Sequence, residues 1–420
     1  MKFVFGGAAV ALALAPSVAA AQAYGSPATP TPPASPSQPA QATASIDAAI
    51  KPSPQAAKAI GELQTAVNAN DVANIPAKVA AAQAAAKTKA DNYWIARMQL
   101  KAAVDSNDYA AAQAAIDAIN ATGLLPAAQI LGLYAGLGGS AFNAKQYALA
   151  ASAFGHVVAI DPNNVEATID LGRSRAAAGQ GAEAVTALKR AIQLQSAGGK
   201  KPDEQLLKQA VGIAYNAKLP SALDFSREWV TNYPSPQSWH DTIAIYRNLS
   251  HQDGESTLEL LRLMQATGAM RSATDYSLFV QAAEEQRNFN EAQAVIDAGI
   301  AANAINPTDA QFKDLIADVK ARQKPTAADL TEAVTMSPSG INLLRIGDGF
   351  YALGNYSKAA EIYRQTIGKA GVDTDVANLH LGMALARAGD KAGATAAFNA
   401  VTGPRADIAK LWLIYLQQQA

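Results

Sequence analysis

Apolar side chains recur every third or fourth residue along most of this chain, which is the spacing of one face of an α-helix. From residue 55 onward they form runs of about ten to fifteen residues. Short polar pairs separate these runs, such as Asn70-Asp71, Asn107-Asp108 and Gly354-Asn355. The alternation of apolar and polar residues that marks a strand is almost absent. The pattern therefore predicts an all-α protein of short helices joined by tight turns.

The helical runs repeat one arrangement of small and bulky residues. A glycine recurs at Gly138 and Gly172, 34 residues apart, and again at Gly347 and Gly382, 35 residues apart. A fixed period of this length is the signature of a repeat protein. Twelve residues after each glycine stands an alanine, and a bulky residue follows four positions later. In the order of the glycines, these pairs are Ala150 and Phe154, Ala184 and Leu188, Ala359 and Tyr363, and Ala394 and Phe398.

This arrangement resembles the tetratricopeptide repeat, in which an aromatic residue, Leu-Gly, Ala-x3-Phe and Pro occur at fixed spacing. One unit follows it with Tyr134, Leu137, Gly138, Ala150, Phe154 and Pro162. The resemblance covers nearly all of residues 55–404, with four close units and weaker copies between them. It implies helix-turn-helix repeats stacked in a right-handed α-solenoid, because one helix pair cannot bury its apolar face alone. The small residues would mark the places where two helices approach closely.

The first residues of the chain predict an export signal. Lys2 precedes an apolar stretch, which ends in a run of small residues before Gln22. These features are typical of a secretory signal peptide, with cleavage expected after Ala21 or Ala23. The chain has no cysteine, so it lacks the disulfides of many secreted proteins and the lipid-carrying residue of a lipoprotein. We therefore expect a periplasmic protein whose mature chain has no integral membrane segment.

The chain divides into segments of different composition. Residues 24–54 are rich in Pro and Ala, and they predict a disordered linker with too little apolar bulk to fold. The remaining predicted segments are the signal peptide 1–23, the clear and degenerate repeats 55–306, an irregular helical break 307–339, two carboxyl-terminal repeats 340–404 and a capping helix 405–420. Whether the break is a hinge is left open.

The charge balance argues against nucleic acid as a partner. Lys and Arg total 34 against 35 for Asp and Glu, whereas nucleic-acid binding normally needs a basic excess. The four histidines show no metal-binding spacing, and His240 and Asp241 are expected to point apart on a helix. The histidines are therefore predicted at the surface, with no metal and no cofactor. No Walker loop or nucleophile elbow is present.

One fragment resembles the lytic transglycosylases of the periplasm. Glu255-Ser256 and Leu263-Met264-Gln265 are similar to that family's catalytic Glu-Ser and its Gly-Leu-Met-Gln segment. The two pieces are too close together, and Arg262 replaces the glycine. Both pieces fall on one apolar-periodic run, so Leu260, Leu261 and Met264 are expected to be core residues. We therefore predict that the protein is not an enzyme.

The tetratricopeptide resemblance implies that a concave face, lined mainly by first helices, receives a protein or peptide partner. Carried onto this sequence, the predicted partner-binding residues are Arg173, Arg247, Arg345, Asp348, Tyr351, Met383 and Arg387. Tyr351, Met383 and Arg387 belong to the best-matching pair of units, so that stretch is the first candidate. The Lys and Asn clamp that some family members use for a partner's terminal carboxylate is not reproduced.

Three functions follow from these observations. The first is a periplasmic scaffold or adaptor that binds an envelope or secretion protein through the concave face. The second is a self-associating structural protein, and the third is an accessory or degenerate member of the periplasmic lytic enzymes. The sequence leaves the oligomeric state and the partner's identity open.

Overall fold

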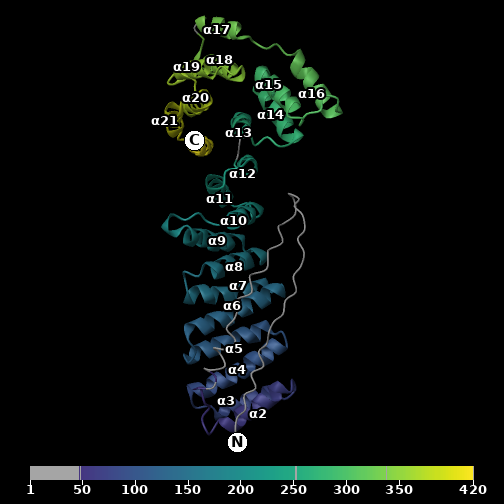
Figure 1. The fold of residues 1–420 in the computed structure, drawn as a ribbon, viewed down its shortest axis with the longest axis vertical. Coiled ribbons are helices and arrows are strands. Elements are labelled where there is room, and N and C mark those ends of the chain that lie inside the picture. The colour runs from purple at the N-terminus through teal and green to yellow at the C-terminus, as the bar shows by residue number, and fades with distance from the viewer. Residues whose placement is uncertain (1–46, 48, 251–252, 337, 420) are drawn as a thin grey trace. The chain divides into compact units, whose positions relative to one another are not determined.

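The computed structural model describes residues 47, 49–250, 253–336 and 338–419 of the chain. The regular elements of these residues are helices, and none is a strand, so the predicted all-α class is confirmed (Figure 1). None of the described helices is both long and apolar enough to cross a membrane. The predicted signal peptide 1–23 and linker residues 24–46 and 48 lie outside the described residues.

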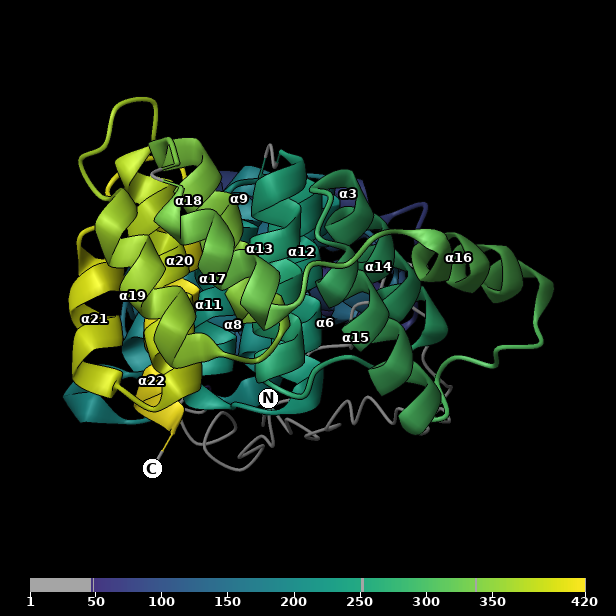
Figure 2. The same cartoon turned by 90° about the horizontal axis from the view of Figure 1, so that it is seen from above.

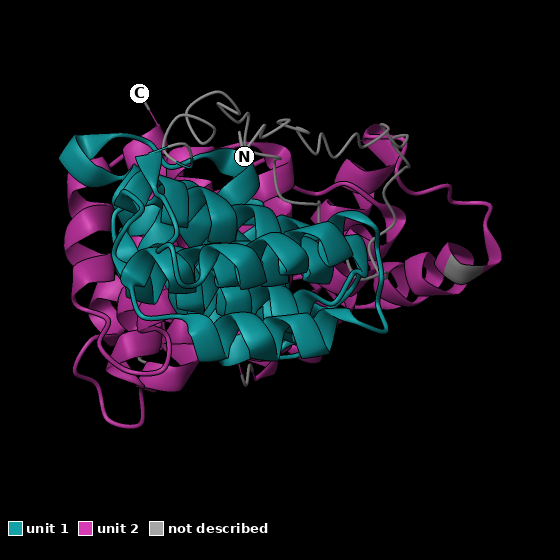
Figure 3. Ribbon diagram, turned by 90° about the horizontal axis from the view of Figure 1, so that it is seen from below, with its two compact units in different colours: residues 1–219 teal, residues 220–420 magenta. Residues whose placement is uncertain are grey.

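The chain separates into two compact units, residues 1–219 and residues 220–420 (Figure 3). Unit 1 contains nine described α-helices, which pack mainly against their neighbours in sequence. They are α2 (Ala57–Asn68), α3 (Ile75–Ala85), α4 (Lys89–Asp105), α5 (Tyr109–Thr122), α6 (Ala127–Asn143), α7 (Tyr147–Ile160), α8 (Val165–Ala177), α9 (Gly181–Gln195) and α10 (Glu204–Asn216).

Unit 2 contains the remaining helices. They are α11 (Ser221–Asn232), α12 (Pro236–Leu249), α13 (Gly254–Ala266), α14 (Ala273–Glu285), α15 (Phe289–Ala301), α16 (Ala310–Ala321), α17 (Ala327–Thr335), α18 (Gly340–Ala352), α19 (Tyr356–Thr366), α20 (Thr374–Ala388), α21 (Lys391–Asn399) and α22 (Ala406–Gln418). The predicted break 307–339 holds α16 and α17 and lies inside unit 2, whereas the two units divide between Leu219 and Pro220.

The predicted turns form where the sequence places them. Asn107 and Gly354 have φ values of 56° and 74°, a left-handed conformation that ends a helix. The next residue then caps the following helix. Asp108 accepts a hydrogen bond from the backbone N–H of Ala111 at 3.0 Å, and Asn355 does the same for Lys358 at 3.3 Å. At 107–108 and 354–355 the pair therefore both stops one helix and starts the next, whereas Asn70-Asp71 ends α2 and α3 begins only at Ile75.

The recurring glycines lie at close contacts between the two helices of a repeat. A Cβ added to Gly138 would lie 2.9 Å from the Phe154 ring, and one added to Gly347 would lie 2.5 Å from the Tyr363 ring. Gly172 faces Leu188 at 2.8 Å in the same way, and Gly382 faces Phe398. Only a residue without a side chain fits such a contact. The structure thus confirms the repeat frame predicted from the sequence.

The last helix does more than cover the final repeat. Leu411 and Trp412 of α22 are fully buried. Gln418 accepts a hydrogen bond from Trp239 Nε1 at 3.0 Å and donates one to the Val230 carbonyl at 2.9 Å. Helix α22 therefore returns to the first helices of unit 2 and closes that unit on itself.

Candidate functional site

Helix α13 occupies the place in unit 2 where the sequence predicted a partner. Every residue from Leu258 to Met264 is buried, including the charged Glu259 and Arg262. A helix that is buried all round has neighbours on every side. In both Figure 1 and Figure 2, α13 lies between α14 and α20. The groove that would receive a partner helix thus holds a helix of the same chain.

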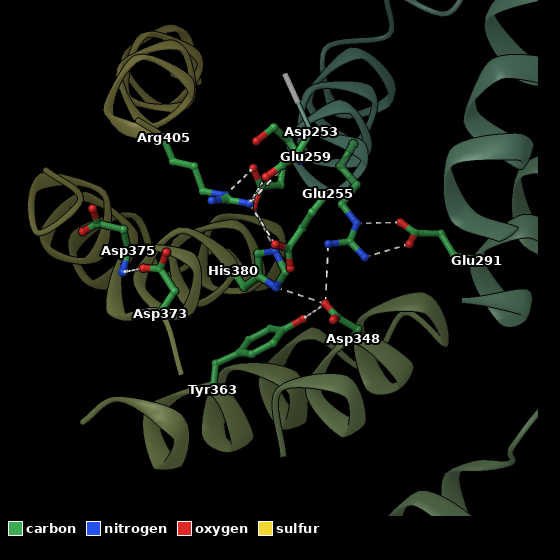
Figure 4. A network of polar contacts seen from close by, with 12 residues as sticks. Asp253, Glu255, Glu259, Glu291, Asp348, Tyr363, Asp373, Asp375, His380 and Arg405 are labelled. Atoms are coloured by element: carbon green, nitrogen blue, oxygen red, sulfur yellow. Dashed lines mark hydrogen bonds and ion pairs between the residues drawn. The ribbon is translucent and has the colours of Figure 1, made fainter. Parts of the chain in front are cut away.

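Asp348 on α18 connects this face to α13. Its Oδ1 accepts a hydrogen bond from the Tyr363 hydroxyl at 2.7 Å (Figure 4). The same oxygen lies 3.5 Å from Nη1 of Arg262 and 3.1 Å from Nδ1 of His380. The His380 contact is an ion pair rather than an aligned hydrogen bond, because Nδ1 meets no hydrogen-bond geometry. Asp348 was predicted to face a partner, and its contacts here are within unit 2.

Arg262 is the charged residue at the centre of α13. Its Nε and Nη2 donate to the two carboxylate oxygens of Glu291 on α15, at 2.8 and 2.7 Å. Its guanidinium also lies 4.8 Å from the centre of the Tyr351 ring. Such a two-pronged pair, with a ring stacked on the guanidinium, satisfies a buried arginine. Arg262 therefore fixes α13 to α15 and α18 at once.

Glu259 makes the corresponding contacts on α13 toward the carboxyl end of the chain. Its Oε1 lies 3.2 Å from Nε2 of His380 and accepts a hydrogen bond from Nε of Arg405 at 3.0 Å. Arg405 also reaches Glu255 at 2.8 Å and Asp253 at 3.2 Å. These residues join α13 to α20 and to the residue that precedes α22.

This buried network carries an excess of negative charge, which sets the state of His380. Burial by itself lowers the pKa of His380, but Asp348 and Glu259 outweigh it and raise the pKa to about 9. For Asp348, burial favours a higher pKa, and His380 and Arg262 instead lower it to about 2. Each cation of the network thus faces at least two carboxylates, and Asp253, 61% exposed, lies at its solvent edge. Its five carboxylates, those of Asp253, Glu255, Glu259, Glu291 and Asp348, face three cations, Arg262, Arg405 and protonated His380.

Two further residues predicted to bind a partner are buried in the core of unit 2. Tyr351 is 7% exposed and Met383 is fully buried, so neither presents a surface. The prediction treated them as part of an open groove, but α13 fills it. Arg387 is half-buried and donates to the Tyr356 hydroxyl at 3.0 Å. The first candidate stretch from the sequence is therefore largely used for intramolecular packing.

Arg345 and Arg247 have different surroundings. Arg345 on α18 is exposed. Arg247 on α12 is half-buried, and its Nε finds no hydrogen-bond partner among the described residues. Burial lowers the pKa of Arg247, against the opposing charge of Asp275. Neither arginine forms an ion pair with the network around α13 among the described residues.

In unit 1 the matching positions are Lys101, Gly139 and Arg173, and all three are half-buried. Arg173 on α8 immediately follows the close-packed Gly172, as Asp348 and Met383 follow their own close-packed glycines. Its Nε donates to Gln209 on α10 at 3.0 Å, and its Nη1 donates to Asp170 at 3.3 Å. Burial raises the pKa of Asp170 to about 6, although Arg173 opposes this. The side chain of Arg173 is 20% exposed, and these partners come from its own and the next repeat.

On α6 the same position is Gly139, which is half-buried and has no side chain. A Cβ at Gly139, or at the exposed Gly136 one turn earlier, would meet no heavy atom of the described residues within 4 Å. Lys101 on α4 stands at the equivalent place in the preceding repeat. We call the surface of Lys101, Gly136, Gly139, Arg173 and Gln209 the unit 1 face. It combines an exposed backbone surface with charged side chains at both ends.

The fragment that resembles lytic enzymes belongs to α13 and serves its packing. Leu260, Leu261 and Met264 are fully buried, which confirms their prediction as core residues. Burial raises the pKa of Glu255, and Arg405 holds this carboxylate at 2.8 Å. The residues that suggested catalysis therefore lie in the ion network of unit 2.

The histidines correct two expectations from the sequence. His380 was predicted at the surface but is 2% exposed. His240 and Asp241 were expected to point apart, yet Nδ1 of His240 lies 3.2 Å from Asp241 and Nε2 lies 3.2 Å from Asp275. Within the part of the chain that the structure describes, no group of His, Asp and Glu is arranged to hold a metal.

The buried network was missed because helical periodicity treats charged residues as exposed. The available signal was the run from Leu258 to Met264, in which Glu259 and Arg262 interrupt an otherwise apolar segment. A run that is apolar on every side of a helix predicts complete burial. Charged residues within it then require buried partners.

Comparison with known proteins supports the repeat frame. Tetratricopeptide repeat models match residues 141–196 and residues 342–370, one segment in each unit. None of the curated proteins matches the sequence. Among solved structures, the apo form of the quorum sensor NprR from B. thuringiensis aligns with 74% of this chain and 97% of that chain. The identity is 12% and the TM-score 0.26, so this likeness carries no argument about function.

Proposed function

We propose that this chain, which carries tetratricopeptide repeats, is a protein-interaction scaffold whose working surface is the unit 1 face. One observation carries the choice of surface. The equivalent face of unit 2 is filled by α13, with Met383 fully buried, whereas Gly139 has open space above it. An exposed helix backbone lets a partner's main chain approach closely. The partner is a protein or peptide, and the scaffold does no chemistry of its own.

The chemistry of the unit 1 face favours an extended peptide with mixed character. Lys101 and Arg173 offer cations, and Gln209, half-buried beside Arg173, offers an amide. Between these side chains Gly136 and Gly139 leave room for apolar or backbone contact. We further propose that the protein works in the periplasm, exported by residues 1–23, and that its partner is an envelope or secretion protein.

Crosslinking in intact host cells tests this function. A photoreactive residue replaces Gly136 or Gly139, and matched variants place it at the exposed Lys189 on α9 and at the buried Met383. Adducts are identified by mass spectrometry. We expect one dominant partner from the two glycine positions and none from the controls. Equal capture from Lys189 would reject the unit 1 face as the working surface.

The same experiment separates the scaffold from self-association. Adducts that contain only this chain, from Gly136 or Gly139, would favour the structural alternative. Light scattering coupled to size exclusion then gives an independent answer, because a scaffold of this kind remains the same size across concentrations. Cell fractionation with a carboxyl-terminal tag checks the proposed compartment, and retention in the cytoplasm would contradict it.

A further inference from the structure

The end of the predicted linker lies on the first long helix of unit 1. Asp47 forms an ion pair with Arg97 of α4 at 2.8 Å, and the Tyr93 hydroxyl donates to the same carboxylate. Trp94 Nε1 donates to the Ile50 carbonyl at 2.7 Å. Side chains of α4 thus bind the described end of the predicted linker.

A third contact continues the same segment. The backbone N–H of Ser53 donates to Asp91 at 2.6 Å, and its hydroxyl donates to the other carboxylate oxygen at 2.9 Å. Residues 50–53 have no regular secondary structure, so α4 holds them as a peptide would be held. Three positions are held, each three residues apart: the Asp47 carboxylate, the Ile50 carbonyl and the Ser53 N–H and hydroxyl. The aliphatic side chain of Ile50 also packs against the core cluster that contains Tyr93 and Trp94.

The charge distribution along the sequence points to a specific site at Arg97. No charged residue occurs between Lys2 and Asp47, so Asp47 is the first carboxylate of the chain. That single carboxylate is met by a guanidinium and a phenol together. Burial and the contact with Asp47 both raise the pKa of Tyr93, which keeps its hydroxyl a donor. Two donors on one carboxylate are the usual means of recognising an acidic side chain.

This site is continuous with the unit 1 face. Arg97 stands one helical turn before Lys101, and Lys101 is equivalent to Gly139 and Arg173 in the repeat frame. A peptide that runs from Arg97 toward Arg173 would therefore follow the first helices in order. Tyr93, Trp94 and Asp91 are buried under this segment, but its end is partly open, since the Arg97 and Asp47 side chains are exposed by 23% and 20%. Such contacts are easier to exchange than a buried helix.

We propose that the Tyr93, Trp94 and Arg97 surface of α4 is a peptide-docking site, occupied in cis by Asp47 and residues 49–53. Its ligand in trans is a peptide segment with an acidic residue three positions before an aliphatic residue. This proposal rests on the proposed scaffold function and names the chemistry of its partner. The tethered segment acts as an internal competitor, because a short tether gives it an effective concentration near the millimolar range.

A peptide-binding experiment with the full chain tests the proposal. The probe is a fluorescein-labelled synthetic peptide of residues 44–55, measured by fluorescence polarisation. Asp47→Ala in the chain weakens the cis contact and leaves α4 intact. We expect this variant to bind the probe at least about tenfold more tightly than the unchanged chain. Adding Arg97→Ala to it, or replacing Asp47 by Asn in the probe, should reduce binding by about tenfold or more.

Two outcomes would overturn the site. One is no binding to the Asp47→Ala chain while its circular dichroism remains helical, which would make Asp47 and residues 49–53 a permanent part of the fold. The other is binding that does not depend on Arg97. If Asp47→Ala fails to fold, Asp47→Asn and Ser53→Ala provide milder variants for the same comparison. A partner still captured at Gly139 would then leave the scaffold function standing without this site.

Discussion

The two units are built from the same repeat but use its inner face in opposite ways. In unit 1, Arg173 pairs with Asp170 and with Gln209 of the next repeat, so its contacts are local. In unit 2, His380 reaches Glu259 across 121 residues, and Gln418 reaches Val230 across 188. The repeat frame alone therefore does not decide whether a face is open. That depends on whether later helices return to cover it.

The largest effect is expected from Arg262→Ala. This change leaves Glu291 and Asp348 without their buried cation, and breaking one partner of a buried pair costs about 3–5 kcal/mol. The matched change Lys101→Ala in unit 1 removes a surface pair with Asp105, with side chains 38% and 31% exposed, and should cost about 1 kcal/mol or less. Hydrogen exchange read separately for residues 220–420 and 1–219 compares the two. An equal loss of stability in both units would contradict the difference between a covered face in unit 2 and an open face in unit 1.

The second effect depends on pH. The pKa of His380 is raised to about 9 in the folded chain, above its ordinary value of 6.5. Its stabilising contribution is therefore complete below pH 6.5 and is lost as pH rises through 9. The loss is on the order of a few kcal/mol, and His380→Gln should remove this part of the dependence. The rest belongs to His240, whose pKa Asp241 and Asp275 also raise to about 9. Three of the four tryptophans, Trp229, Trp239 and Trp412, lie in unit 2, so urea unfolding followed by fluorescence reports on that unit. A flat stability curve between pH 6.5 and 9.5 would contradict the assigned pairing.

The third effect compares two adjacent glycines. Gly138→Ala forces a Cβ against the Phe154 ring and should destabilise unit 1 by about 1–3 kcal/mol. Gly139→Ala meets no atom of the described residues, and it should stabilise α6 by about 0.5–1 kcal/mol. Hydrogen exchange of residues 127–160 should become faster in Gly138→Ala and slower in Gly139→Ala. Destabilisation by Gly139→Ala would mean that the unit 1 face is covered.

The sequence predicted those parts of the fold that depend on neighbours in the chain. Asn107 and Asp108 specify their turn, and Gly347 and Ala359 specify their helix contact, through residues at most a repeat apart. A periodic pattern records such contacts because each repeat meets the same requirement. The repeat frame of both units is therefore predictable from the amino-acid sequence alone.

The covering of unit 2 could not be predicted in this way. Glu259 and Arg405 are 146 residues apart, and no period connects them. Helical periodicity also places charged residues outside, whereas Arg262 is 2% exposed. Met383 shows the effect of this long-range packing. Its position in the repeat predicts that it lines a groove, but in the structure it lies in the hydrophobic core. The position of a residue in the repeat predicts which face of the helices could bind a partner. Whether that face is covered in a given unit depends on long-range packing.

The smallest effect tests the closure of unit 2 at its last contact. Gln418→Ala removes the hydrogen bonds to Trp239 Nε1 and to the Val230 carbonyl, and the net loss should be about 1 kcal/mol. The neighbouring Gln417→Ala is the control, because Gln417 is exposed on the same helix. In the part of the chain that the structure describes, Gln418 has no hydrogen bond to α13. If the closure of unit 2 protects α13, Gln418→Ala should nevertheless speed hydrogen exchange in residues 254–266 as well as in α22. Faster exchange confined to residues 406–418 would show that the last turn frays alone, and that the network around Arg405 holds unit 2 closed without it.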